Sequence, residues 1–141
     1  MKVNITGPNG GVVSNELSNE VLSAVRFYAK ELGICRLHNN IKIRLHQKFL
    51  VHDAYGLCYS FDNRNFIIDI CLYSDWLSTL AHEMVHVKQF STGELATDMT
   101  RWKNRNNVDD LDYWDQPWEK EAHRLEHTLK NRYVNLLSYN R

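Results

Sequence analysis

Residues 77–90, LSTLAHEMVHVKQF, place two histidines and a glutamate inside an otherwise apolar helical pattern. When the residues are projected at about 100° per position, apolar side chains occupy most of the helix circumference. One narrow edge carries four polar residues, His82, Glu83, His86 and Gln89. The stretch therefore predicts a mostly buried helix whose single polar edge faces a functional site.

The spacing of the two histidines suits a metal ion. His82 and His86 lie one helical turn apart, so both imidazoles can reach one zinc ion at about 2.0–2.1 Å. Glu83 follows the first histidine and can hold a water molecule on that ion. The order His82-Glu83-Met84-Val85-His86 is the HExxH motif, and its uncharged inner residues suit a buried helix. We predict Zn²⁺ bound by His82 and His86, with Glu83 as the general base.

A catalytic zinc ion takes three protein ligands and leaves a position for water. Residues 118–123, WEKEAH, offer the third ligand at the start of a last predicted helix. On a helical projection Glu119 borders the apolar stripe, whereas Glu121 falls among the basic and polar residues of a solvated face. We predict Glu119 as the third ligand, because a metal site needs a dry wall beside a cleft, and Glu121 is the alternative.

Three other side chains are candidates to support this chemistry. Tyr113, His123 or His127 could give a second hydrogen bond to a developing oxyanion. For Tyr113 packing against Trp114 is the simpler expectation, and for His127 exposure to solvent. Residues 123–127 also spell the inverted order HxxEH, but only 14 residues follow to supply the downstream carboxylate which that order needs.

The remaining sequence predicts one α+β domain over residues 1–141. Ser14 or Asn15 and Ser74 or Asp75 are the expected helix N-caps. Helices are predicted at 15–32, from Ser74 or Asp75 to about 90, and at 117–137. Strands are predicted at 2–6, 41–47, 54–62 and 65–73. Residues 94–116 match no element, and their aromatic side chains, Trp102, Tyr113 and Trp114, predict a loop that is packed against the domain.

Composition sets further limits. The chain has 17 basic and 17 acidic residues, so no net charge attracts it to nucleic acid or to an anionic membrane. It lacks a secretory signal and an apolar run of about 18 residues, which predicts a cytoplasmic protein without a membrane partner. Cys35, Cys58 and Cys71 have no CxxC spacing and are predicted to be buried, reduced thiols.

Two parts of the chain carry a family resemblance. HExxH followed by a glutamate from a later helix resembles the gluzincin metallopeptidases. LAHEMVHVKQ, then GEL, a Trp-Lys pair and DYWDQPWEKEAHRLE, resembles the small zincin-like proteins of tailed phages and, in outline, SprT-like domains. This resemblance covers about residues 70–127.

The resemblance implies a minimal zincin-like domain: an N-terminal helix, a short mixed sheet of three or four strands, the HExxH helix and a closing C-terminal helix. Residues 65–73 would form the edge strand on which an extended peptide lies. His123, four residues after Glu119, would orient a zinc-bound histidine. If the chain is phage-encoded, its location would be the host cytoplasm.

The function expected from these residues is zinc-dependent hydrolysis of peptide bonds in a peptide or protein substrate. One alternative is a non-catalytic, zinc-containing protein-binding module, which would have no need of Glu83. Another is a SprT-like protease acting on DNA-bound proteins. That alternative draws on a few basic residues, Arg36, Lys42, Arg44 and Lys48, but the acidic segment 109–115 would repel phosphates, so nucleic acid is not an expected partner.

Overall fold

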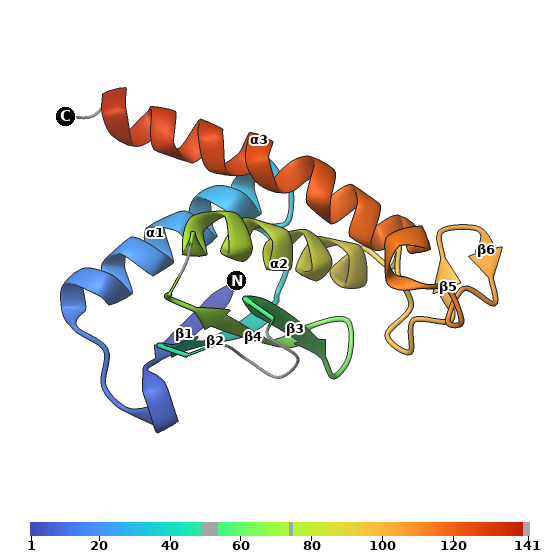
Figure 1. Cartoon of the computed structure of the whole chain (residues 1–141), viewed down its shortest axis with the longest axis horizontal. Coiled ribbons are helices and arrows are strands. Elements are labelled where there is room, and N and C mark those ends of the chain that lie inside the picture. The colour runs from blue at the N-terminus through green and yellow to red at the C-terminus, as the bar shows by residue number, and fades with distance from the viewer. Residues whose placement is uncertain (49–53, 74, 140–141) are drawn as a thin grey trace.

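The structure, a computed structural model, describes residues 1–48, 54–73 and 75–139. Over these residues it has an α+β fold, with three α-helices, a four-stranded mixed sheet and a small two-stranded sheet. The three α-helices lie on the same side of the larger sheet (Figure 1). The predicted fold class is confirmed.

The larger sheet has the order β1-β2-β4-β3. Its strands are β1 (Lys2–Thr6), β2 (Asn40–His46), β3 (Gly56–Ser60) and β4 (Asn65–Cys71). β1, β2 and β4 run parallel, and β3 pairs antiparallel with β4. α1 (Asn15–Glu31) connects β1 to β2, as parallel neighbours require.

The prediction that residues 65–73 form the edge strand is wrong. β4 lies between β2 and β3, and β3 is the edge strand. The nearly continuous run of apolar side chains in β4 explains this position, because a strand with neighbours on both sides needs few polar residues. The edge available beside the HExxH helix is therefore β3.

The three α-helices start and end close to the predicted positions. α2 spans Trp76–Ser91 and α3 spans Pro117–Tyr139. The side chains of Ser14 and Asp75 cap α1 and α2 by accepting hydrogen bonds from backbone N–H groups three residues on, at 3.2 and 3.3 Å. Ser74, the other predicted cap, lies outside the described residues. Gly33 and Gly93 follow the helices with φ of +75° and +79°, the left-handed conformation that ends many helices.

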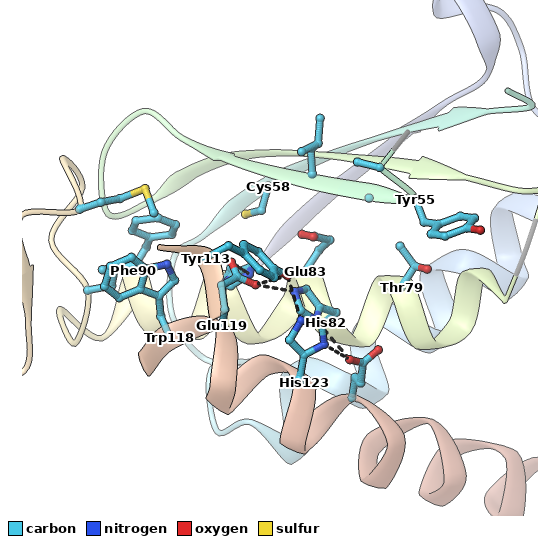
Figure 2. A pocket seen from close by; sticks show the side chains of 17 residues that line it. Tyr55, Cys58, Thr79, His82, Glu83, Phe90, Tyr113, Trp118, Glu119 and His123 are labelled. Carbon is cyan, nitrogen blue, oxygen red and sulfur yellow. Dashed lines mark hydrogen bonds and ion pairs between the residues drawn. The ribbon is translucent and has the colours of Figure 1, made fainter. Parts of the chain in front are cut away.

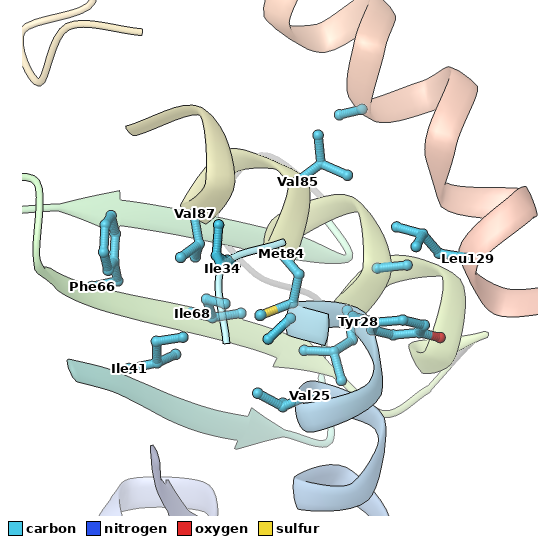
Figure 3. Packing of buried hydrophobic residues seen from close by; sticks show 14 of the residues in the cluster. Val25, Tyr28, Ile34, Ile41, Phe66, Ile68, Met84, Val85, Val87 and Leu129 are labelled. Carbon is cyan, nitrogen blue, oxygen red and sulfur yellow. The ribbon is translucent and has the colours of Figure 1, made fainter. Parts of the chain in front are cut away.

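The core fixes the orientation of α2. Met84 and Val87 face the sheet near Ile68, whereas Val85 points to α3 on the other side (Figure 3). These side chains are fully buried, and each such burial contributes about 1.5–3 kcal/mol to stability. With two faces of α2 held in this way, the edge with His82 and His86 must face the space between β3 and α3.

The segment between α2 and α3 contains more structure than the sequence indicates. It forms a ribbon of β5 (Arg101–Trp102) and β6 (Arg105–Asn106), followed by the short 3₁₀ helix η3 (Tyr113–Asp115). Trp102 is buried, and its ring centroid lies 6.3 Å from that of Trp118. The predicted packing of the aromatic side chains is right for Trp102, whereas Trp114 is 72% exposed and only one face of its ring packs, on His123 with centroids 5.3 Å apart.

Two other predictions concern the cysteines and membranes. The three thiols are free, and Cys71 is buried and Cys58 partly buried. Cys35 is exposed, so its predicted burial is wrong; it follows α1, where the neighbouring Ile34 takes the buried position.

Within the described ranges, no helix is both long enough and apolar enough to cross a membrane.

Asp69 on β4 gives the fold a pH dependence. Its carboxylate is only 5% exposed, accepts two hydrogen bonds of 2.7 Å from Arg44 and lies 2.8 Å from His46 Nε2. Burial alone would raise the pKa of Asp69, but these contacts outweigh burial and hold the pKa below its ordinary value. Asp69 therefore stabilises the fold above an unfolded-state pKa of about 3.9, and this contribution is lost as the pH falls toward the folded-state pKa.

We expect Asp69→Asn to lower the free energy of unfolding at pH 7 by about 1.5–3 kcal/mol, the usual value of hydrogen bonds to a charged group. The variant should also lose less stability than the wild type between about pH 5 and pH 2. Urea unfolding at a series of pH values measures both effects. An equal acid-induced loss in the two proteins would contradict this role.

Candidate metal centre

The polar edge of α2 meets the first turns of α3. Glu119 on α3 lies between the two histidines, with Oε1 2.9 Å from His82 Nε2 and Oε2 3.1 Å from His86 Nε2. These side chains are 9–12% exposed. The structure thus brings together, from two helices, the residues that the sequence predicts as zinc ligands (Figure 2).

The spacing of these atoms suits a single cation. Two ligands about 2.1 Å from one ion in tetrahedral geometry lie about 3.4 Å apart, close to the separations between Glu119 and the histidines. Two overlapping sets of side chains bring their ligand atoms within 4.8 Å of one another: His82 with Glu119 and His123, and His82 with Glu83 and His86. Nitrogen and carboxylate donors in this number are the usual ligands of zinc.

The electrostatics of the centre favour a positive charge. Burial would lower the pKa of His82, but its contacts with Glu119 and Glu126 raise that pKa to about 10. Burial would raise the pKa of Glu119, but the two histidines outweigh it and hold the pKa well below its ordinary value. Burial would also lower the pKa of His86, but Glu119 and Glu83 raise it above its ordinary value. A divalent cation would balance the charge of these carboxylates.

Glu83 points into the same pocket and has a different environment. Its side chain is on α2 opposite β3, and the residue is 5% exposed. Among the described residues, its Oε2 is a buried oxygen without a hydrogen-bond partner. Burial raises the pKa of Glu83, with the nearby histidines opposing the shift. An unpartnered carboxylate oxygen beside the ligand set can accept a hydrogen bond from a water molecule or a substrate.

Gln89 fixes the second histidine, a role that the sequence did not reveal. Gln89 is fully buried, and its Oε1 lies 2.8 Å from His86 Nδ1. Its Nε2 donates to Trp118 O at 2.9 Å and to Glu121 Oε1 at 3.1 Å. The Gln89 oxygen accepts a hydrogen bond from the Nδ1–H group of His86. The other ring nitrogen of His86, Nε2, then faces Glu119. The only sequence signal was the position of Gln89 on the polar edge of α2.

Glu121, the alternative third ligand, lies in a separate cluster. Its Oε1 accepts from Gln89 and from Lys88 Nζ, the latter at 3.2 Å. The side chain is 12% exposed, so the predicted solvated position is wrong. Glu121 faces α2 because the start of α3 packs against that helix. It supports Gln89 and leaves Glu119 as the glutamate that contacts both histidines.

Tyr113, His123 and Glu126 line the other side of the centre. Tyr113 touches Trp114 as expected, with ring centroids 5.0 Å apart, but its hydroxyl also donates to Glu119 Oε1 at 3.0 Å and lies 2.9 Å from His123 Nε2. Burial and Glu119 raise the pKa of Tyr113, so the hydroxyl keeps its proton at neutral pH. Tyr113 is therefore a hydrogen-bond donor in the centre.

Glu126, which the sequence indicated only as the glutamate of the HxxEH order, contacts both His123 and His82. Its Oε1 lies 2.9 Å from His123 Nδ1 and 3.4 Å from His82 Nδ1. It therefore orients both imidazoles. The rings of His123 and His82 are in direct contact, with centroids 4.6 Å apart, but their nitrogens are linked only through Glu126. His127 is exposed, as expected, so the inverted HxxEH order does not bring both of its histidines to the centre.

A pocket of about 570 Å³ surrounds these groups. One side is formed by β3 and the residues before it, with Tyr55, Gly56 and Cys58. The end beyond Glu119 is apolar and is lined by Phe90, Leu95, Met99 and Trp118. Figure 2 shows Phe90 and Trp118 at one end of this pocket and Tyr55 and Thr79 at the other, with Glu83 between them. The centre is thus open to a ligand that extends along β3.

In comparisons with known proteins, no family model matched the chain, and no curated protein or solved structure matched it significantly.

Proposed function

We propose that the chain is a zinc-dependent metallopeptidase, with His82, His86 and Glu119 as the metal ligands. One observation supports this most strongly: both Nε2 atoms lie within 3.1 Å of a Glu119 oxygen, and the unpartnered Glu83 oxygen lines the same pocket. A purely structural zinc site would not need Glu83 and would usually be closed by a fourth protein ligand.

When bound, zinc supplies a water molecule that loses its proton near neutral pH, and polarises the scissile carbonyl. Glu83 accepts the proton of that water and returns it to the leaving amine as general acid. Tyr113, a protonated hydroxyl within the centre, donates a hydrogen bond to the developing oxyanion, with His123 beside it. Gln89 and Glu126 keep the imidazoles in the required orientation throughout.

The substrate would lie along β3, whose outer edge can pair with an extended peptide backbone. This arrangement replaces the expected use of residues 65–73. The apolar end of the pocket, with Phe90, Leu95, Met99 and Trp118, favours a substrate that places an apolar side chain next to the scissile bond.

Hydrolysis of a broad peptide library, analysed by mass spectrometry with and without a chelator, tests the proposal. We expect cleavage that stops with the chelator and returns on addition of Zn²⁺. Chelator-sensitive binding of peptides without any cleavage would instead favour the zinc-containing binding module.

Gln89→Met tests how the ligand His86 is held. Without the amide oxygen, His86 loses the partner that fixes its ring, and we expect zinc affinity to fall by about 10- to 100-fold. Competition with a chromogenic chelator measures the Kd. Glu121→Gln is the matched control, because it removes a charge from the same cluster but can still accept from Gln89. Equal affinity of Gln89→Met and the wild type would exclude this positioning role.

Gly56→Ala tests the approach of β3 to α2. An added Cβ would lie 2.5 Å from Thr79 Cγ2 and 3.2 Å from Glu83 Cγ, so Thr79 or all of α2 must shift and the Glu83 side chain must also move slightly. We expect kcat/KM to fall by about 10- to 100-fold, as small displacements of catalytic groups do, with zinc content unchanged. Adding Thr79→Ser removes the Cγ2 methyl and should restore part of the activity. No recovery in the double variant would show that the contact with Thr79 is not the cause.

A further inference from the structure

The side of the larger sheet opposite the α-helices carries its own set of exposed side chains. Strand register places Asn4, Lys42, Ile67 and Tyr59 in one row across all four strands. Lys2, Asn40 and Asn65 form the next row, and Phe61 N donates to Asn65 O just beyond β3. Figure 1 shows that no α-helix covers this side. We call these eight residues the outer face.

The outer face is hollowed and positively charged. A second pocket of about 430 Å³ lies on it, with Lys2, Lys42, Phe61 and Asn65 among its lining residues. Both lysines are exposed and, within the ranges that the structure describes, neither forms an ion pair.

The acidic groups nearby are engaged. Asp69 is in the adjoining row, buried and paired with Arg44, so it contributes little negative potential. Asp62, in the turn after β3, keeps its negative charge and accepts hydrogen bonds from the backbone N–H groups of Arg64 and Asn65, and the nearby Arg64 guanidinium offsets that charge. The two free lysines therefore set the sign of the local potential.

Aromatic rings lie on the same face as these charges, with β4 between β3 and the strand that carries Lys42. Phe61 is 66% exposed and Tyr59 41% exposed, although large apolar side chains are usually covered. Tyr59 lies in the row of Ile67, and Phe61, the first residue after β3, lines the pocket on the same face. Exposed rings at one side of a face and unpaired lysines at the other suit a single strand that crosses the face, with nucleobases stacked on the rings and phosphates at the ammonium groups. Asn65 is held by Asn40 and Asp62, so the amide of Asn4 and the side-chain oxygen of Asn40 are the polar groups that can contact base edges or sugars.

We propose that the outer face binds single-stranded nucleic acid, with bases on Tyr59 and Phe61 and phosphates at Lys2 and Lys42. This inference does not depend on the proposed peptidase. It shares only Lys42 with the basic segment noted in the sequence, because Arg44 is held by Asp69, and Lys2 and Tyr59 come from other strands. A duplex is disfavoured, since its bases are not free to stack on side chains.

Fluorescence anisotropy of a labelled 15-nucleotide oligothymidylate with the full chain tests the proposal, with a duplex of the same length for comparison. We expect binding to the single strand, weaker binding to the duplex, and a log–log salt slope of about −1.4 for two phosphate contacts. Tyr59→Ser with Phe61→Ser should weaken binding at least tenfold, because one stacked base accounts for about a 5- to 150-fold effect. Separately, Lys2→Ala with Lys42→Ala should weaken binding at least tenfold, because it removes both phosphate contacts.

Two controls make the result decisive. Arg26→Ala with Lys30→Ala removes the same charge from exposed positions on α1 and should leave binding unchanged. His82→Ala should also bind as the wild type does, which separates this proposal from the metal centre. Circular dichroism checks that each variant is folded, and the lysine pair alone suffices if the aromatic pair unfolds. No binding by the wild type, equal binding of the duplex, equal loss in the α1 control, or displacement of the oligonucleotide by polyglutamate at equal charge would overturn the proposal.

Discussion

Glu83→Gln is expected to bind zinc as the wild type does and to lose hydrolysis by a factor of about 10² to 10⁴ or more. The amide keeps the size of the carboxylate but cannot accept a proton from water. Glu83 is not among the three proposed ligands, so the metal should stay. Zinc content by atomic spectroscopy and kcat/KM on a peptide found in the library screen measure the two effects separately.

Two comparisons complete this experiment. His82→Ala should lose both zinc and activity, which shows that the assay reports the metal centre. The circular dichroism spectrum of Glu83→Gln should match that of the wild type, because the variant replaces a buried carboxylate oxygen that has no partner among the described residues. Full activity of Glu83→Gln on any peptide would exclude Glu83 as the general base.

Glu119→Ala is the second large effect. It removes the carboxylate that contacts both histidines, so we expect zinc affinity to fall by far more than the roughly 10- to 100-fold effect of losing a hydrogen bond to a ligand. Activity should fall with it. Chelator competition at a fixed pH gives the Kd of each variant.

Glu121→Ala is the matched comparison, because it removes the same side chain two residues along the helix. We expect at most a moderate loss of affinity, caused by the missing contacts with Gln89 and Lys88. If Glu121→Ala abolished zinc binding while Glu119→Ala retained it, the two glutamates would have to exchange roles.

The HExxH helix and its neighbours could be predicted from local patterns. The apolar period of α2 is a local signal for the helix itself. Its boundaries and those of α1 also have local signals, namely the caps Ser14 and Asp75 and the glycines that follow the two helices. The α+β class followed from the order of helical and alternating segments. Glu119 could be chosen over Glu121 because helical projection already places it at the border of the apolar stripe.

Features that depend on how distant segments pack were missed. The order β1-β2-β4-β3 places β3 at the edge, and no local pattern in residues 54–62 states which neighbour it lacks. Gln89 and Glu126 are ordinary polar residues on their own helices, and their contacts with His86 and His82 exist only once α2 and α3 are packed. The outer face is assembled from four strands, and sequence spacing therefore gave no sign of it.

The central claim is that one zinc ion joins α2 to α3. Anomalous scattering at the zinc edge from a crystal of the protein tests it most directly. The account predicts a single strong peak about 2.0–2.2 Å from His82 Nε2, His86 Nε2 and a carboxylate oxygen of Glu119. A peak held by other residues, or side chains of these three that point to separate surfaces, would contradict it.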